Sequence, residues 1–124
     1  MPTFDDGTHY SVALTQSEAM ALTLLIEAAV AAALAPVFAR PAMRCAAAAV
    51  IASTITHPIL WTIYGDAQTL FGAFTTPVLE AGVIAAETIA YRVLATPRWD
   101  EAALLSLLVN AASWSAGELI YLLN

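Results

Sequence analysis

Five ionisable side chains lie inside long apolar stretches of this chain, where a charge is costly to keep. One is Glu87; the other four are three carboxylates and one imidazole: Glu27, His57, Glu80 and Glu118. At bilayer depth a charged side chain costs about 2.5–3.5 kcal/mol, so such groups face the inside of a helix bundle and pair there. Imidazole and carboxylate groups bind divalent metals or relay protons. We therefore predict an ion- or proton-binding site centred on His57 and Glu80, with the other two of these four residues as further ligands.

The rise of a helix sets the depth at which these side chains meet. If residues 65–68 form an outer loop, His57 and Glu80 lie at similar distances from it along two neighbouring helices. The four residues named above are then expected in the outer half of the membrane. Glu87 and Asn110 are expected together in the inner half.

A further set of residues has the spacing of helix–helix contacts: Glu87, Ser106, Asn110, Ser113 and Gly117. Glu87 follows Glu80 by seven residues, so the two carboxylates share one helix face. The other four form a stripe of small or polar residues, which lets helices approach closely in lipid and hydrogen-bond across their interface. We predict that this stripe packs against the carboxylate face.

A purely structural role for the buried acids is the alternative. Burial favours the neutral form of a carboxyl group, which then needs only hydrogen-bond partners. Candidate partners are Asn110, Thr54, Thr56 and Ser113. As a third possibility, His57 ligates haem or a chlorophyll-like pigment; apart from that, no cofactor is predicted.

The composition indicates the elements that must position these groups. Of the 124 residues 60% are hydrophobic and only 11% are charged, against roughly 25% charged in soluble domains. Four runs reach the length of about 20 apolar residues that a membrane-spanning helix needs: residues 18–38, 45–64, 71–95 and 101–123. The sequence therefore predicts an all-α fold, a single domain over residues 1–124 that forms a bundle of four transmembrane helices in contact with lipid.

The arginines predict the orientation of that bundle. All four basic residues are arginines, and they lie in or beside the first and third connections: Arg40, Arg44, Arg92 and Arg98. Because cytoplasmic loops are enriched in Lys and Arg, both connections are expected inside and both termini outside, as are Asp5 and Asp6. The first run is expected to stay as a helix, since the residues before it lack the basic segment of a cleaved signal. Arginine without lysine and abundant alanine suggest the cytoplasmic membrane of a GC-rich bacterium.

Helix boundaries carry their own signals. Thr15 and Glu18 have the spacing of a capping box, and Asp100 can cap the last helix. Pro58 and Pro77 should each kink a helix. An alternative start for the third helix is Pro77, with residues 70–75 as an interfacial or re-entrant piece.

Three short motifs resemble a pattern in small polytopic bacterial membrane proteins that have no assigned activity. The motifs are Thr56-His57-Pro58 followed by Trp61, the pair Glu80 and Glu87 with Tyr91, and Asn110-Ala111-Ala112-Ser113 with Gly117. The resemblance covers the last three helices. It implies membrane placement.

Three classes of function remain after this inspection. The first is an accessory or assembly subunit of a larger membrane complex or homo-oligomer. The second is a component of an ion, proton or divalent-metal transporter. An enzyme ranks last, because no GxSxG, HExxH, Walker or GxGxxG motif is present and no catalytic residue can be nominated. Nucleic acid is excluded as a partner by ten acidic residues against four basic ones.

Overall fold

The structure is a computed structural model that describes residues 14–123. Within this range every regular element is helical, which confirms the all-α class. The elements are α1 (Gln16–Leu34), the 3-10 turn η1 (Ala35–Phe38), α2 (Ala42–Phe71), the 3-10 turn η2 (Gly72–Phe74), α3 (Thr75–Leu94) and α4 (Trp99–Leu123). Asp5 and Asp6 lie outside the described residues.

Local signals explain where α1 begins and ends. The predicted capping box is present: the Glu18 amide donates to Thr15 Oγ1 at 3.2 Å, and the Thr15 amide donates to Glu18 Oε2 at 2.8 Å. At the other end Pro36 opens η1, and Ala39 takes a left-handed conformation with φ 52°. This reversal turns the chain back towards α2.

The turn between α2 and α3 is at Gly72, later than predicted. Residues 65–68, expected as a loop, lie in the last two turns of α2. This helix is continuous and also contains Pro58. Gly65 costs a helix only about 1 kcal/mol, which its helix-forming neighbours offset. Gly72 has φ 53° and ψ −122°, a conformation that side chains with a Cβ avoid. α3 then begins at Thr75 with Phe74 as its N-cap, so neither a start at Pro77 nor a re-entrant piece is present.

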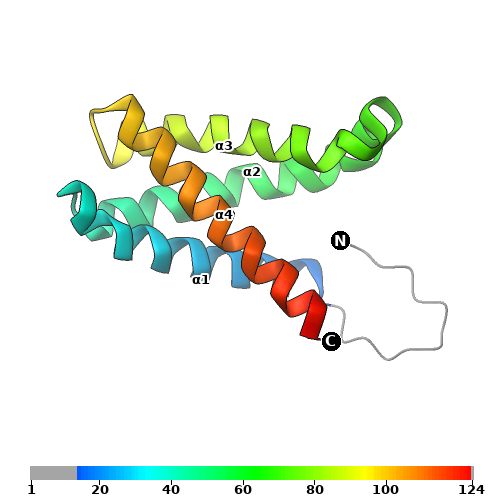
Figure 1. Ribbon diagram of the computed structural model, residues 1–124, viewed down its shortest axis with the longest axis horizontal. Coiled ribbons are helices and arrows are strands. Elements are labelled where there is room, and N and C mark those ends of the chain that lie inside the picture. Colours follow the sequence, from blue (N-terminus) through cyan, green and yellow to red (C-terminus); the bar gives the residue numbers. More distant parts are fainter. Residues whose placement is uncertain (1–13, 124) are drawn as a thin grey trace.

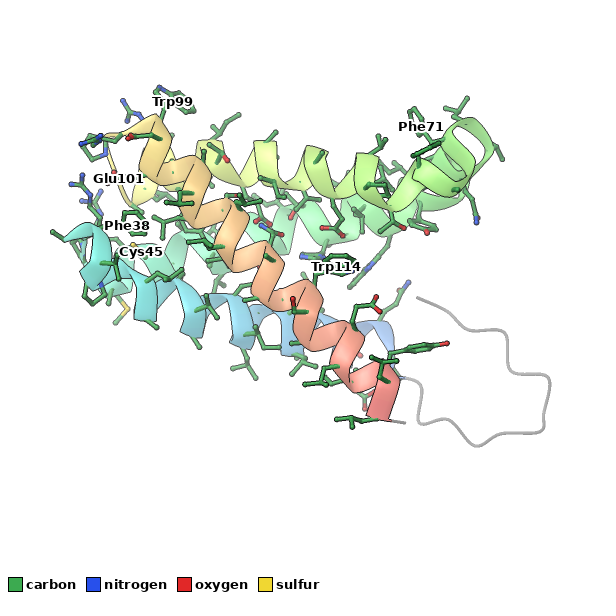
Figure 2. The ribbon with its side chains drawn as sticks, in the orientation of Figure 1. Phe38, Cys45, Phe71, Trp99, Glu101 and Trp114 are labelled. Carbon is green, nitrogen blue, oxygen red and sulfur yellow. The ribbon has the colours of Figure 1, made fainter. Side chains whose placement is uncertain are left out.

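The helices form a splayed bundle (Figure 1). α2 and α3 lie side by side and antiparallel, α1 packs on α2, and α4 crosses obliquely over α1 and α3. α4 begins at Trp99, two residues earlier than predicted, so Asp100 lies in its first turn rather than at the cap. Both connections that carry arginines lie at one end, opposite the α2–α3 turn; Figure 2 shows Trp99 and Glu101 at that end and Phe71 at the other.

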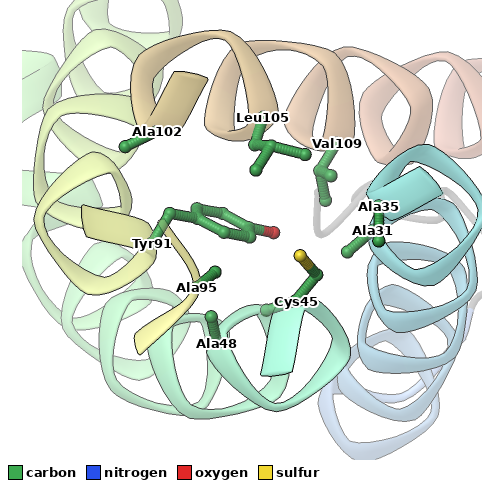
Figure 3. Packing of buried hydrophobic residues seen from close by; sticks show 10 residues of the cluster. Ala31, Ala35, Cys45, Ala48, Tyr91, Ala95, Ala102, Leu105 and Val109 are labelled. Atoms are coloured by element: carbon green, nitrogen blue, oxygen red, sulfur yellow. The ribbon is translucent and has the colours of Figure 1, made fainter. Parts of the chain in front are cut away.

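The core is built mostly of alanine and lies towards the arginine end. Its buried members are Ala31, Ala35, Cys45, Ala48, Ala49, Tyr91, Ala95, Ala102, Leu105 and Val109. Tyr91, the largest of them, fills the space that the small side chains leave (Figure 3). Tyr91 has no exposed surface.

Three helical segments are long and apolar enough to cross a membrane: Gln16–Phe38, Ala42–Leu94 and Trp99–Leu123. The middle segment has 53 residues and is folded in two at Gly72. Leu, Ile, Val and Phe side chains cover much of the outer surface of these segments, for example Leu25 at 70% and Val93 at 69% exposed. Such a surface matches lipid better than water.

Candidate metal centre

Three ionisable side chains from three helices converge in the middle of the bundle. Glu27 comes from α1, His57 from α2 and Glu87 from α3, and one ligand atom of each lies within 4.8 Å of the other two. Both carboxylates are 1% exposed, and His57 is half-buried. The cluster therefore joins two acids and an imidazole in a site that excludes most solvent.

The antiparallel pairing of α2 and α3 places His57 opposite Glu87. His57 precedes the turn at Gly72 by fifteen residues and Glu87 follows it by fifteen (72 − 57 and 87 − 72). Equal counts along two antiparallel helices give equal depths. The sequence-based expectation counted from residues 65–68, and for that reason it matched His57 with Glu80.

The cluster lies deep in the bundle, away from either end. Glu87 is seven residues before the end of α3 at Leu94, which corresponds to about 10 Å along the helix. Asn110, which contacts Glu87, is eleven residues after the start of α4, or about 16 Å. Glu27, expected in the outer half of the membrane, thus lies beside Glu87, expected in the inner half.

Neutral polar side chains surround the carboxylates. Ser53 Oγ donates to Glu27 Oε2 and lies 3.3 Å from Glu87 Oε1. Glu87 also accepts from Thr56 Oγ1 at 3.1 Å and from Asn110 Nδ2, whose amide is held by the Ser106 carbonyl at 2.9 Å. All four helices therefore take part in orienting the two acids.

Two atoms of the cluster have no hydrogen-bond partner among the described residues. They are Glu27 Oε1 and His57 Nε2, both fully buried, which face each other at 3.7 Å. That separation is too long for a hydrogen bond. Buried polar atoms nearly always find a partner, so this pair is either an ion pair with a protonated His57 or two ligands of a bound cation.

The geometry suits a metal ion. Imidazole nitrogen and carboxylate oxygen bind transition metals at about 2.0–2.2 Å, so two ligands of one ion lie about 3–4 Å apart. The 3.7 Å gap falls in this range. Two carboxylates and a neutral imidazole also carry the charge that balances a dication in a medium of low dielectric constant.

The remaining predicted ligands lie outside this cluster. Glu80 is half-buried on α3, two helical turns from Glu87 towards the α2–α3 turn, within electrostatic range of His57 and Glu27. Glu118 is exposed near the end of α4.

The small-residue stripe of α4 divides into two parts. Ser106 and Asn110 are buried, and Ser106 Oγ donates to the Ile84 carbonyl of α3 at 2.9 Å. Ser113 is half-buried, and Gly117 is exposed with no other atom near its Cβ position. The hydrogen bonds to α3 come from the first half of the stripe.

Ser53 is the residue that the sequence reasoning missed. It precedes His57 by four residues, so the two share a helix face, and this spacing was a signal that could have found it. The hydroxyl group considered instead, that of Thr54, is exposed and donates to its own helix at the Val50 carbonyl, 2.6 Å away.

Comparisons with protein family models, with curated proteins and with solved structures find no match to this chain.

Proposed function

We propose that the protein is a multi-pass membrane protein in which α1, α2, α3 and α4 each cross the bilayer, with both termini outside a bacterial cytoplasmic membrane. Two observations support this topology. α3, the shortest span after α1, has 20 residues and reaches about 30 Å, the thickness of the hydrocarbon core. All four arginines lie at one end, around the end of α3 and the start of α4, as expected for the cytoplasmic side.

Within that bundle, we propose that Glu27, His57 and Glu87 bind a divalent transition-metal cation, and that the protein is a component of a metal-transport system. The observation that carries this proposal is the facing pair of unsatisfied atoms, Glu27 Oε1 and His57 Nε2. At 3.7 Å the two atoms form an ion pair when His57 is protonated; with a neutral imidazole neither has a partner within residues 14–123, and a cation between them supplies one.

The donor set favours one class of cation. One nitrogen and two carboxylate oxygens suit Zn²⁺, Mn²⁺, Fe²⁺ or Co²⁺, whereas Mg²⁺ and Ca²⁺ prefer oxygen ligands alone. Glu80 is half-buried between the cluster and the α2–α3 turn. Its carboxylate can bind a cation that enters from that end.

Binding by the purified chain in detergent tests the site directly. We expect one equivalent of Zn²⁺ or Co²⁺ by equilibrium titration, with excess Mg²⁺ unable to displace it. Glu27→Gln or His57→Ala should lower the affinity by at least about 100-fold, because either change removes one of three ligands. Glu118→Gln is the matched control, since it removes an exposed carboxylate outside the cluster and should bind as the wild type. Equal affinity in all variants would reject the site.

Transport is tested separately, in proteoliposomes. Metal flux should be present in the wild type, fall strongly in Glu87→Gln and fall partly in Glu80→Gln. Tight binding without any flux would leave a metal-binding protein that does not transport on its own.

A role as a subunit of a larger assembly is a second candidate, favoured by the outer half of α4. The last buried residue of α4 is Asn110, and the following turns up to Leu123 contribute no buried side chain. Glu118 is exposed there between apolar neighbours, an arrangement that a partner helix would relieve. Mild-detergent purification should then yield a homo-oligomer or a fixed partner, and a monodisperse monomer would argue against this role.

A further inference from the structure

At the arginine end of the bundle, two of the four arginines are paired with carboxylates and the other two are not, within the residues that the structure describes. Arg40 Nε donates to Glu101 Oε2 at 2.8 Å, and Arg98 forms a two-point contact with Asp100 at 2.7 and 3.1 Å. These hydrogen bonds raise the pKa of both guanidinium groups and neutralise their charge locally. Among residues 14–123, no carboxylate forms an ion pair with Arg44 or Arg92.

Arg44 and Arg92 line the same pocket. Its volume is about 320 Å³, and its other walls are Val93, Ala95, Thr96 and Pro97. The pocket lies where the end of α3 meets the start of α2 and the connection to α4. It therefore combines two positive charges that lack a counter-charge with a hydroxyl-bearing residue at one rim of the bundle.

Both guanidinium groups are held in place by contacts that leave their charge uncompensated. Arg44 Nε donates to the Leu94 carbonyl at 2.7 Å, which ties α2 to the end of α3. Arg92 stacks on the Trp99 ring at 5.5 Å, and its Nε is buried without a hydrogen-bond partner in the described part of the chain. Pre-oriented arginines of this kind match the planar two-point recognition of phosphate oxygens.

We infer that this pocket binds the phosphate group of an anionic lipid headgroup in the cytoplasmic leaflet. Basic pockets between helices on that side of a membrane recognise such headgroups, and exposed Trp99 marks the level of the interface. The inference rests on the membrane placement proposed above. It is independent of the metal centre, which lies deeper in the bundle.

Lipid retention by the full chain in detergent tests the inference. Phosphatidylglycerol should raise the thermal midpoint of the wild type and stay bound in native mass spectrometry, whereas phosphatidylcholine should do neither. Arg92→Gln and Arg44→Gln should each weaken retention about ten-fold, as expected for the loss of one charge-assisted hydrogen bond. Arg98→Gln is the matched control, because it removes a cation at the same end whose charge is already paired.

The outcomes separate the two proposals. Equal stabilisation by both lipids would overturn the pocket and leave the membrane placement standing, while no stabilisation by either lipid would count against both.

Inorganic phosphate provides a second experiment. Stabilisation by phosphate that is lost in Arg44→Gln would assign the pocket to soluble phosphate instead of lipid. Arg44 is exposed, so its variant should fold even where Arg92→Gln does not, and unchanged lipid selectivity in Arg44→Gln would reject the inference.

Discussion

Ser53 is shared between the two buried carboxylates of the cluster. Its hydroxyl group has one proton to donate, yet it contacts both Glu27 and Glu87. One serine therefore fixes the relative position of two acids that come from different helices. Loss of a residue that orients metal ligands in this way typically lowers metal affinity about 10–100-fold.

We expect Ser53→Ala to lower Zn²⁺ affinity about 10–100-fold without changing the stoichiometry, because the ligands remain but lose their orientation. Isothermal titration of the purified variant measures both quantities. Thr54→Ala is the control: its hydroxyl group bonds only to its own helix, so its affinity should equal that of the wild type. A variant at Ser53 that binds normally would mean that the serine has no part in the site.

Metal affinity should fall as the pH is lowered from about 8 to about 5.5, since carboxylates and imidazole bind a metal only when deprotonated. Protons and metal compete for the same three side chains, so binding should also release protons into a weakly buffered solution. Titrations in buffers of different ionisation enthalpy measure the number released. Affinity that is constant across this range would exclude His57 as a ligand.

Tyr91 fills the alanine core but leaves its hydroxyl group buried without a partner among the described residues. Tyr91→Ala should destabilise the bundle by about 3–5 kcal/mol, because the neighbouring side chains are too small to close the cavity. Tyr91→Phe should be neutral or stabilising by about 1 kcal/mol, because it removes an unsatisfied polar group and keeps the ring. Thermal unfolding in detergent compares the two, and a strongly destabilised Phe variant would show that the hydroxyl group has a partner.

At the scale of the elements, a turn misplaced by only a few residues decided which side chains were expected to meet. Gly65 and Asp66 are typical turn residues, so the sequence favoured a loop there, and His57 was matched with Glu80. With the turn at Gly72, the residue of α3 that lies opposite His57 is about two helical turns further along, which is Glu87. The polar residues inside the apolar helices could thus be recognised from the sequence, but their pairing depended on where α2 ends.

The two glycines give an element-scale test of that turn. Gly65→Ala should stabilise the protein by about 0.4–1 kcal/mol, because position 65 is helical and nothing lies within 4 Å of the added Cβ. Gly72→Ala should destabilise it by about 1–3 kcal/mol, because its φ of 53° with ψ −122° strains any residue with a Cβ. Chemical denaturation of both variants measures the signs, which would be reversed if the turn were at Gly65.

At the scale of the whole molecule, composition alone was sufficient to predict helices suited to lipid. The scarcity of charge and the four apolar runs predicted these helices, and the capping box at Thr15 predicted the start of α1. The oblique crossing of α4 was not predictable, because alanine-rich faces fit together at many angles and carry no pattern that selects one. For the same reason, the division of the α4 stripe at Asn110 came only from the structure.

The proposed topology predicts which ends of the molecule face each side of the membrane. In intact cells, Ala73→Cys should react with an impermeant thiol reagent, because it lies in η2 at the outer end. Val37→Cys should react only after the membrane is permeabilised, because it lies in η1 at the arginine end. Both positions are exposed, and the native Cys45 is buried, so its background should be low. The opposite labelling pattern would invert the topology.

The concentration of methyl-sized side chains near η1 has a mechanical consequence. Separating helices in such close contact would open voids, so we expect that end to keep its geometry. At the opposite end the pair α2 and α3 diverges from the pair α1 and α4 (Figure 1). A small change in the angle between the two pairs would therefore give a larger displacement there, and spin labels at Leu70 and Leu122 would record it as a changed distance when metal is added.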